Sequence, residues 1–185
     1  MQIDLDLIVK TACRTIRIIQ RGIAADCVAD PETAFDRISF DSWKKRLATI
    51  DLVAQVVAAR RLRDSLKGYD LVIIGEENLR SPDLDLTNKE GLVVLMDMID
   101  GTDLLERDLS NWCSALIFYS PLEKKILASF VGIPNDGVYY ALDGTDGAFK
   151  RSFLGHHKTR RVRGLSSISN LETASACTYN GTRYG

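Results

Sequence analysis

The sequence predicts an α+β fold in which two N-terminal helices pack on a mainly antiparallel sheet. Two observations support this prediction. Over roughly the first third of the chain, apolar residues recur every three or four positions, which is the period of an amphipathic helix. After about residue 70 they form short runs rich in β-branched residues and separated by polar turns, which is typical of strands. Helices followed by strands indicate helices that cover one face of a sheet.

The helices are expected near the N-terminus. The first runs from Leu5 to about Ile23, with Asp4 as its N-cap and Gly22 as its C-terminal stop. The second runs from Trp43 to Leu66. Its buried stripe is expected to consist of Leu47, Ile50, Val53, Val57 and, at its end, Arg61.

The strands are expected from residue 71 onward. Two apolar runs followed by acidic residues, 71–74 and 92–96, are predicted to be buried strands. A short helix is expected from about Thr102. Tight polar turns then separate further apolar runs, which predicts an antiparallel meander. These runs are Cys113–Tyr119, Ile126–Gly132 and Val138–Leu142, with an edge hairpin over Ala148–Val162.

The composition is that of a folded globular chain and excludes several classes of protein. Its 185 residues are 45% hydrophobic and 26% charged, with 24 basic against 25 acidic side chains. This balance argues against a chain that coats nucleic acid, and no apolar run approaches the roughly 20 residues that span a membrane. The acidic start lacks the basic and apolar regions of a signal peptide. We therefore expect a cytoplasmic protein with no nucleic-acid or membrane partner.

Carboxylates stand directly after the first two expected strands. Glu76 and Glu77 follow the first, and Asp97 and Asp100 follow the second. Several buried carboxylates repel one another and lose hydration, so such a group is stable mainly where a cation neutralises it. All the donors are oxygens, which favour Mg²⁺, Ca²⁺ or Mn²⁺ over zinc. The alternative is that the aspartates are ordinary turn or cap residues.

Gly101 and Thr102 follow Asp100 at once and precede the expected short helix. A glycine lets the backbone approach a ligand closely, and free N–H groups at a helix start bind phosphate. A metal beside such an anion site can polarise a phosphoryl group and generate hydroxide from water. The pattern therefore suggests hydrolysis of a phosphate ester. The same letters recur at Asp143-Gly144-Thr145, where no acid stands three residues earlier and no helix pattern follows; we expect a glycine-rich turn there.

These motifs resemble those of the inositol monophosphatase family. Residues 96–102, Met-Asp-Met-Ile-Asp-Gly-Thr, are similar to its Asp-Pro-Ile-Asp-Gly-Thr signature, and Gly75-Glu76-Glu77 to its upstream Gly-Glu-Glu, with 21 positions from Glu76 to Asp97. Residues 48–51, ending in Asp51, resemble a third family segment. The resemblance extends to about residue 155 and implies the N-terminal half of the inositol monophosphatase and fructose-bisphosphatase layered sandwich.

The resemblance implies a Mg²⁺-dependent phosphomonoesterase of the lithium-sensitive type, acting on a small substrate such as inositol monophosphate, and a homodimer. Glu76, Asp97 and the backbone carbonyl of Ile99 would hold one Mg²⁺, and Asp97 with Asp100 a second.

The remaining roles concern the substrate and the water. Gly101 and Thr102 would receive the phosphate, while Thr102 and Asp51 would orient and activate the attacking water. Other substrates of the same class, fructose bisphosphate, a 3′-phosphoadenosine nucleotide or NADP, stay open.

The chain also departs from the family pattern. Met98 replaces the signature proline, Asp103 adds a charge beside the expected phosphate site, and the Trp-Asp motif of the family's second half is absent from the sequence. We therefore expect an N-terminal α+β domain over residues 1–165 and the start of a truncated or absent C-terminal α/β domain over 166–185. A non-catalytic remnant that serves as an interaction module is the alternative.

A basic stretch near the C-terminal edge of the expected sheet has no nearby acid. We favour a solvated hairpin face, and attraction of an anionic substrate is the alternative. Its members are Lys150, Arg151, Lys158, Arg160, Arg161 and Arg163.

Overall fold

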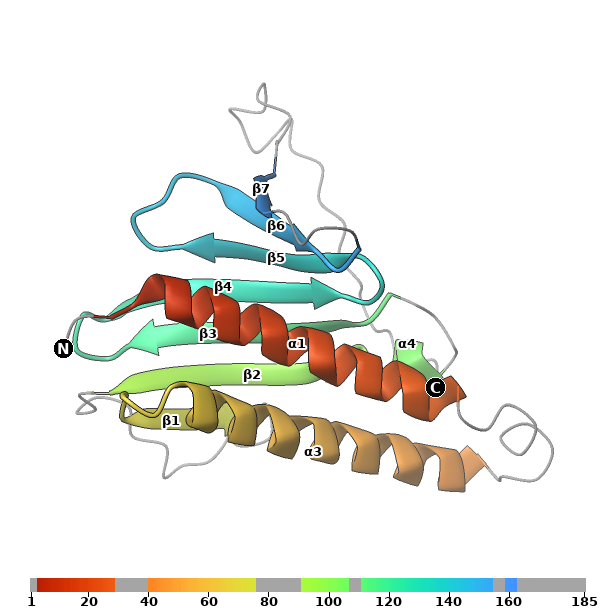
Figure 1. The fold of residues 1–185 in the computed structure, drawn as a ribbon. Helices are drawn as coiled ribbons and strands as arrows, with labels where there is room; N and C mark the ends of the chain where they lie inside the picture. The colour runs from red at the N-terminus through yellow and green to blue at the C-terminus, as the bar shows by residue number, and fades with distance from the viewer. Residues whose placement is uncertain (1–2, 29–39, 76–90, 107–110, 155–158, 163–185) are drawn as a thin grey trace, which may run out of the picture.

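The computed structural model describes residues 3–28, 40–75, 91–106, 111–154 and 159–162. Two long helices cover one face of a seven-stranded sheet whose strands follow in chain order (Figure 1). β1 and β2 are parallel, and every later pair of neighbours is antiparallel. The predicted α+β fold with a mainly antiparallel sheet is confirmed.

The elements lie close to their predicted positions. The helices are α1 (Leu5–Val28), α3 (Phe40–Ser65) and α4 (Thr102–Glu106). The first strands are β1 (Leu71–Gly75), β2 (Leu92–Asp100) and β3 (Cys113–Ser120). They are followed by β4 (Lys125–Ile133), β5 (Gly137–Leu142), β6 (Ala148–Ser152) and β7 (Thr159–Arg161). No helix in the described part of the chain contains a stretch long and apolar enough to span a bilayer.

Helix α1 begins as predicted and ends later than predicted. The backbone N–H of Leu7 donates to the Asp4 carboxylate at 3.0 Å, which confirms Asp4 as the N-cap. Gly22 does not stop the helix, which continues to Val28. A glycine inside a helix costs about 0.5–1 kcal/mol, and here its neighbours Ile19 and Ile23 are buried and lie beside α3, which stabilises the helix.

The buried face of α3 differs from the predicted stripe. Val53 and Val57 are 53% and 38% exposed, whereas Ala54, Ala58 and Leu62 are buried at 4% or less. The prediction for Val53 and Val57 was wrong because it followed the large apolar residues. The helix instead buries its two alanines in the hydrophobic core.

The core lies between α1 and the middle strands. The rings of Phe118 and Phe130 meet edge to face at 5.8 Å, and both side chains are almost fully buried. Gly132 on β4 lies directly under α1, where any Cβ would overlap Ile16. This close contact fixes α1 over the sheet.

Candidate metal and phosphate site

The predicted ligands on β2 lie at an irregularity in its pairing with β3. Asp97 pairs with Ala115 and Asp100 with Cys113, so the register shifts between the two aspartates. The extra residue on β2 makes a β-bulge, and bulges change the direction in which side chains point. The backbone N–H of Ile99 donates to the Asp97 carboxylate at 3.1 Å, which fixes this half-buried side chain.

The structure brings Asp97 and Asp100 to one thiol. The Cys113 sulfur lies 3.5 Å from the exposed Asp100 carboxylate and donates to it. Burial raises the pKa of Cys113 to about 12, with further contributions from the negative charges of Asp100 and Asp97. Without a metal, the thiol is therefore neutral near pH 7. The charged donors of this cluster are carboxylate oxygens, a set that fits Mg²⁺ or Ca²⁺ better than zinc.

A series of buried hydrogen bonds connects α1 to the bulge between Asp97 and Asp100. The amide of Gln20 on α1 donates to the Ser114 hydroxyl at 3.2 Å and to the Gly132 carbonyl at 2.7 Å. The Ser114 hydroxyl in turn donates to the carbonyl of Met98 at 2.8 Å. The Met98 side chain is fully buried. Packing and this hydrogen bond hold the segment that a proline ring stiffens in the family signature.

Gly101 makes the turn from β2 into α4. Its φ of +94° is one that side-chain-bearing residues rarely adopt, and a Cβ there would lie 3.1 Å from Leu104. Its carbonyl accepts the N–H groups of Leu104 and Leu105 at 2.9 and 3.1 Å, which begins the helix. Thr102 is the first residue of α4 and is half-buried. Because α4 has only five residues, any anion here would depend mainly on the local N–H groups.

Asp51 lies on α3, which packs against both β2 and α4. Its half-buried carboxylate accepts a hydrogen bond from the Gln55 amide at 3.4 Å. The helix that carries Asp51 is therefore a neighbour of the elements that carry Asp97 and Thr102. Its role in activating water stays a prediction.

Glu76 and Glu77 lie outside the described residues. Gly75, which precedes Glu76, pairs with Met96, which precedes Asp97. Within the described ranges, no three His, Cys, Asp or Glu side chains gather so as to hold a metal. The structure thus brings together Asp97 and Asp100, and the assignments of Glu76 and of the Ile99 carbonyl as ligands stay predictions.

Sequence reasoning assigned no role to Cys113, Ser114 or Gln20. The available signal was that Cys113 and Ser114 begin the strand after the acidic motif. Their partners depend on the bulge, and Gln20 is 94 positions from Ser114. Long-range contacts of this kind leave no local pattern.

No protein-family model matches this chain, and no curated protein matches its sequence. Solved structures match its fold. Inositol monophosphatase-II from Staphylococcus aureus MSSA476 superposes with a TM-score of 0.60 and 19% identity, over 77% of this chain and 48% of its own. The chain has the inositol monophosphatase fold. The expected fold and the family resemblance are therefore confirmed at the level of structure.

Further inositol monophosphatase structures match the fold of this chain. A calcium-bound inositol monophosphatase family protein from Staphylococcus aureus has a TM-score of 0.59 and 21% identity, over 82% of this chain and 51% of its own. SaIMPase-II with 2′-AMP bound matches at 20% identity with a TM-score of 0.58, over 77% of this chain and 47% of its own. SaIMPase-II with inositol monophosphate bound matches at 20% identity with a TM-score of 0.53, over 76% of this chain and 46% of its own. This chain spans about half the length of the inositol monophosphatases that it matches.

Proposed function

We propose that this chain provides metal ligands and a phosphate-binding turn for a Mg²⁺-dependent phosphomonoesterase of the inositol monophosphatase family. The observation that carries the proposal is the position of Asp97 and Asp100 on either side of a register shift in β2, immediately before the Gly101-Thr102 turn. The inositol monophosphatase fold supports the same reading. Ligands bound to SaIMPase-II, inositol monophosphate and 2′-AMP, support a small phosphate monoester as the substrate class.

The metal would be held by oxygen donors alone. Asp97 and Asp100 would be joined by Glu76 and by the backbone carbonyl of Ile99. A bound Mg²⁺ supplies positive charge that polarises the phosphoryl group and lowers the pKa of water. The calcium-bound neighbour supports a hard divalent cation at this fold.

The other residues would position the substrate and the water. The backbone N–H groups of Gly101 and Thr102 would donate to the phosphate oxygens. The Thr102 hydroxyl would hold the attacking water in line with the phosphorus. Asp51, on the neighbouring helix, would accept the proton that this water loses through Thr102.

The wider expectations belong to the same proposal. Residues 1–165 would form the N-terminal α+β domain, and residues 166–185 would be the start of a truncated or absent C-terminal α/β domain. The resemblance implies a homodimer, and the composition of the sequence favours a cytoplasmic protein with neither nucleic acid nor membrane as a partner. Fructose bisphosphate and 3′-phosphoadenosine nucleotides remain alternative substrates.

The test is Mg²⁺-dependent release of phosphate from inositol 1-phosphate, 2′-AMP and a generic aryl phosphate. We expect D97N to lower the rate by at least about 100-fold, because loss of a ligand exceeds the 10–100-fold effect typical of the residues behind ligands. D146N is the matched control, since Asp146 is an exposed aspartate paired with Arg161. Equal activity of wild type and D97N would contradict the proposal. A wild type that binds Mg²⁺ and releases no phosphate would favour the interaction module.

A second comparison tests the ligand that the structure leaves outside its described residues. We expect E76Q to abolish Mg²⁺ binding, measured by calorimetry, and E77Q to weaken it less, because the resemblance assigns only Glu76 to the metal. The reverse order would place the ligand at Glu77. Equal, unweakened binding in both variants would remove the upstream acids from the site.

A further inference from the structure

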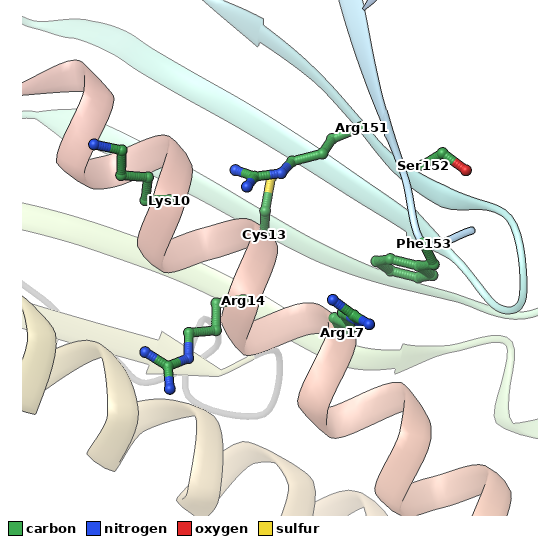
Figure 2. Close-up of a pocket in the computed structure, with 7 residues that line it drawn as sticks. All are labelled: Lys10, Cys13, Arg14, Arg17, Arg151, Ser152 and Phe153. Carbon is green, nitrogen blue, oxygen red and sulfur yellow. The ribbon is translucent and has the colours of Figure 1, made fainter. Parts of the chain in front are cut away.

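A cavity of about 310 Å³ lies between α1 and β6, away from the acidic motif. Its lining side chains come from α1 and from residues 151–153, and none of those described comes from β2 or α4. Figure 2 shows Arg151 reaching from β6 to Cys13 on α1, with Arg17 beside Phe153. Its volume is at the lower end of the range typical of small-ligand sites.

Four cationic side chains line this cavity. Lys10, Arg14 and Arg17 stand at positions i, i+4 and i+7 of α1, so they share one face of the helix. Arg151 joins them from the sheet. Like charges at these helical spacings repel and destabilise the helix, whereas a bound anion would reverse the sign of that interaction. No carboxylate is among the described residues of the lining.

Cys13 adds no negative charge to this group. Burial raises the pKa of its thiol to about 11, although the nearby Arg151 guanidinium acts in the opposite direction. The thiol is therefore neutral at physiological pH and leaves the charge of Arg151 in place. The remaining lining groups, the Ser152 hydroxyl and the Phe153 ring, are uncharged.

Strand geometry divides the basic stretch seen in the sequence. Lys150 lies over the Tyr139 ring and pairs with Asp136, and Arg161 pairs with Asp146 at 2.6 Å. Arg151 follows Lys150 in β6, so its side chain points to the opposite, helix-covered face of the sheet. Lys158 and Arg163 lie outside the described residues. Arg160 lies opposite Lys150 on the outer face, whereas Arg161 lies opposite Phe149, on the face of Arg151. Among these described residues, Arg151 is the one that lines the cavity.

We propose that the cavity between α1 and β6 binds a small polyanion that carries two or more phosphoryl groups. Four cations from two elements match a ligand of several negative charges, and guanidinium groups bind phosphate oxygens through two parallel hydrogen bonds. This site is independent of the proposed phosphatase site.

The test is isothermal titration calorimetry of the full chain with pyrophosphate, in low-salt buffer that contains a chelator. The chelator removes divalent metal, so the Asp97 region cannot hold the ligand through a metal and the two proposals can fail separately. We expect a Kd below about 1 mM, with affinity that falls as salt is added. Binding that persists without metal supports the cavity, and no detectable pyrophosphate binding would overturn the proposal.

Matched charge-removing variants locate the site. R151Q and R17Q should each weaken pyrophosphate binding by about fivefold or more, because each removes a charge-assisted donor. R21Q removes the same charge from an exposed position of α1 outside the lining, and should change the affinity by less than about twofold. Thermal melting checks the folding of each variant. If R17Q is unfolded, R151Q decides the question.

Two outcomes would contradict the proposal. Equal weakening by R21Q and R151Q would mean that the ligand responds to the general charge of α1. Tighter binding of a single-stranded oligonucleotide than of pyrophosphate, with R21Q as damaging as R151Q, would identify an extended nucleic-acid surface in place of a small-anion cavity.

Discussion

The chain contains Asp-Gly-Thr twice, at residues 100–102 and 143–145, and the two copies have different structures. The first closes β2 and begins α4, whereas the second joins β5 to β6. In the second, the N–H and the hydroxyl of Thr145 both donate to the Leu142 carbonyl, at 3.2 and 2.9 Å, which closes a turn. The prediction of a glycine-rich turn at this second copy is confirmed.

The two copies also differ in how their charges are compensated. Asp143 pairs with Lys125 at 2.7 Å and Asp146 with Arg161 at 2.6 Å, all at exposed positions. In the first copy, Asp97 and Asp100 both act on the thiol of Cys113, so negative charge is concentrated there. The same three residues therefore adopt different structures. The first copy differs from the second in having an aspartate three residues earlier and a register shift between the two aspartates.

The largest expected contrast is in the response to Mg²⁺. A metal that binds only the folded state should stabilise the wild type, by about 2.7 kcal/mol when its concentration is 100 times the Kd. The melting temperature should rise accordingly. D100N should lose this rise, and D143N, the corresponding change in the turn, should keep it. In metal-free buffer, D100N should be no less stable than the wild type, because it removes repulsion from Asp97. Differential scanning fluorimetry with and without Mg²⁺ measures all three chains.

Two results would contradict this expectation. An equal Mg²⁺ response in D100N and D143N would remove Asp100 from the metal site. Absence of any response in the wild type at millimolar Mg²⁺ would mean that the two carboxylates bind no metal in this chain.

The next largest contrast is between Gly101 and Gly144, whose replacement by alanine should reduce stability by different amounts. G101A should lower the free energy of unfolding by about 2 kcal/mol and G144A by about 1 kcal/mol. Gly101 has a φ of +94° and a Cβ there would approach Leu104, whereas Gly144 has a φ of +70° and open space around it. Urea unfolding monitored by fluorescence measures both. If G144A costs as much as G101A, the contact with Leu104 is unimportant.

Local signals predicted most of the fold. The Asp4 cap, the period of α1 and the short apolar runs of the strands are properties of neighbouring residues, and the structure confirms them. Errors arose where packing overrides a local signal. Gly22 lies inside α1 because buried neighbours hold the helix, and α3 buries Ala54 and Ala58 in place of its valines.

The sequence predicted which residues form the candidate site, but it did not predict how they are arranged in space. The spacing of Asp97 and Asp100 was sufficient to suggest oxygen ligands. The bulge depends on the register with β3, and the hydrogen bonds from Gln20 through Ser114 to Met98 join segments far apart in the sequence. Such contacts form only when the whole sheet is assembled, so no short window of sequence contains them.

The smallest expected effect concerns the ion pair of the turn. The hydrogen bond from Lys125 lowers the pKa of Asp143, so the pair stabilises the fold above the ordinary pKa of 3.8 and loses this contribution as pH falls through the lowered value. Both side chains are about 40% exposed, so water and salt screen the pair. At pH 7, D143N should lower the melting temperature by less than about 2 °C, and the difference from wild type should shrink in acid and in high salt. A loss comparable to that of G101A, or one that grows in acid, would mean that Asp143 acts through something other than its charge.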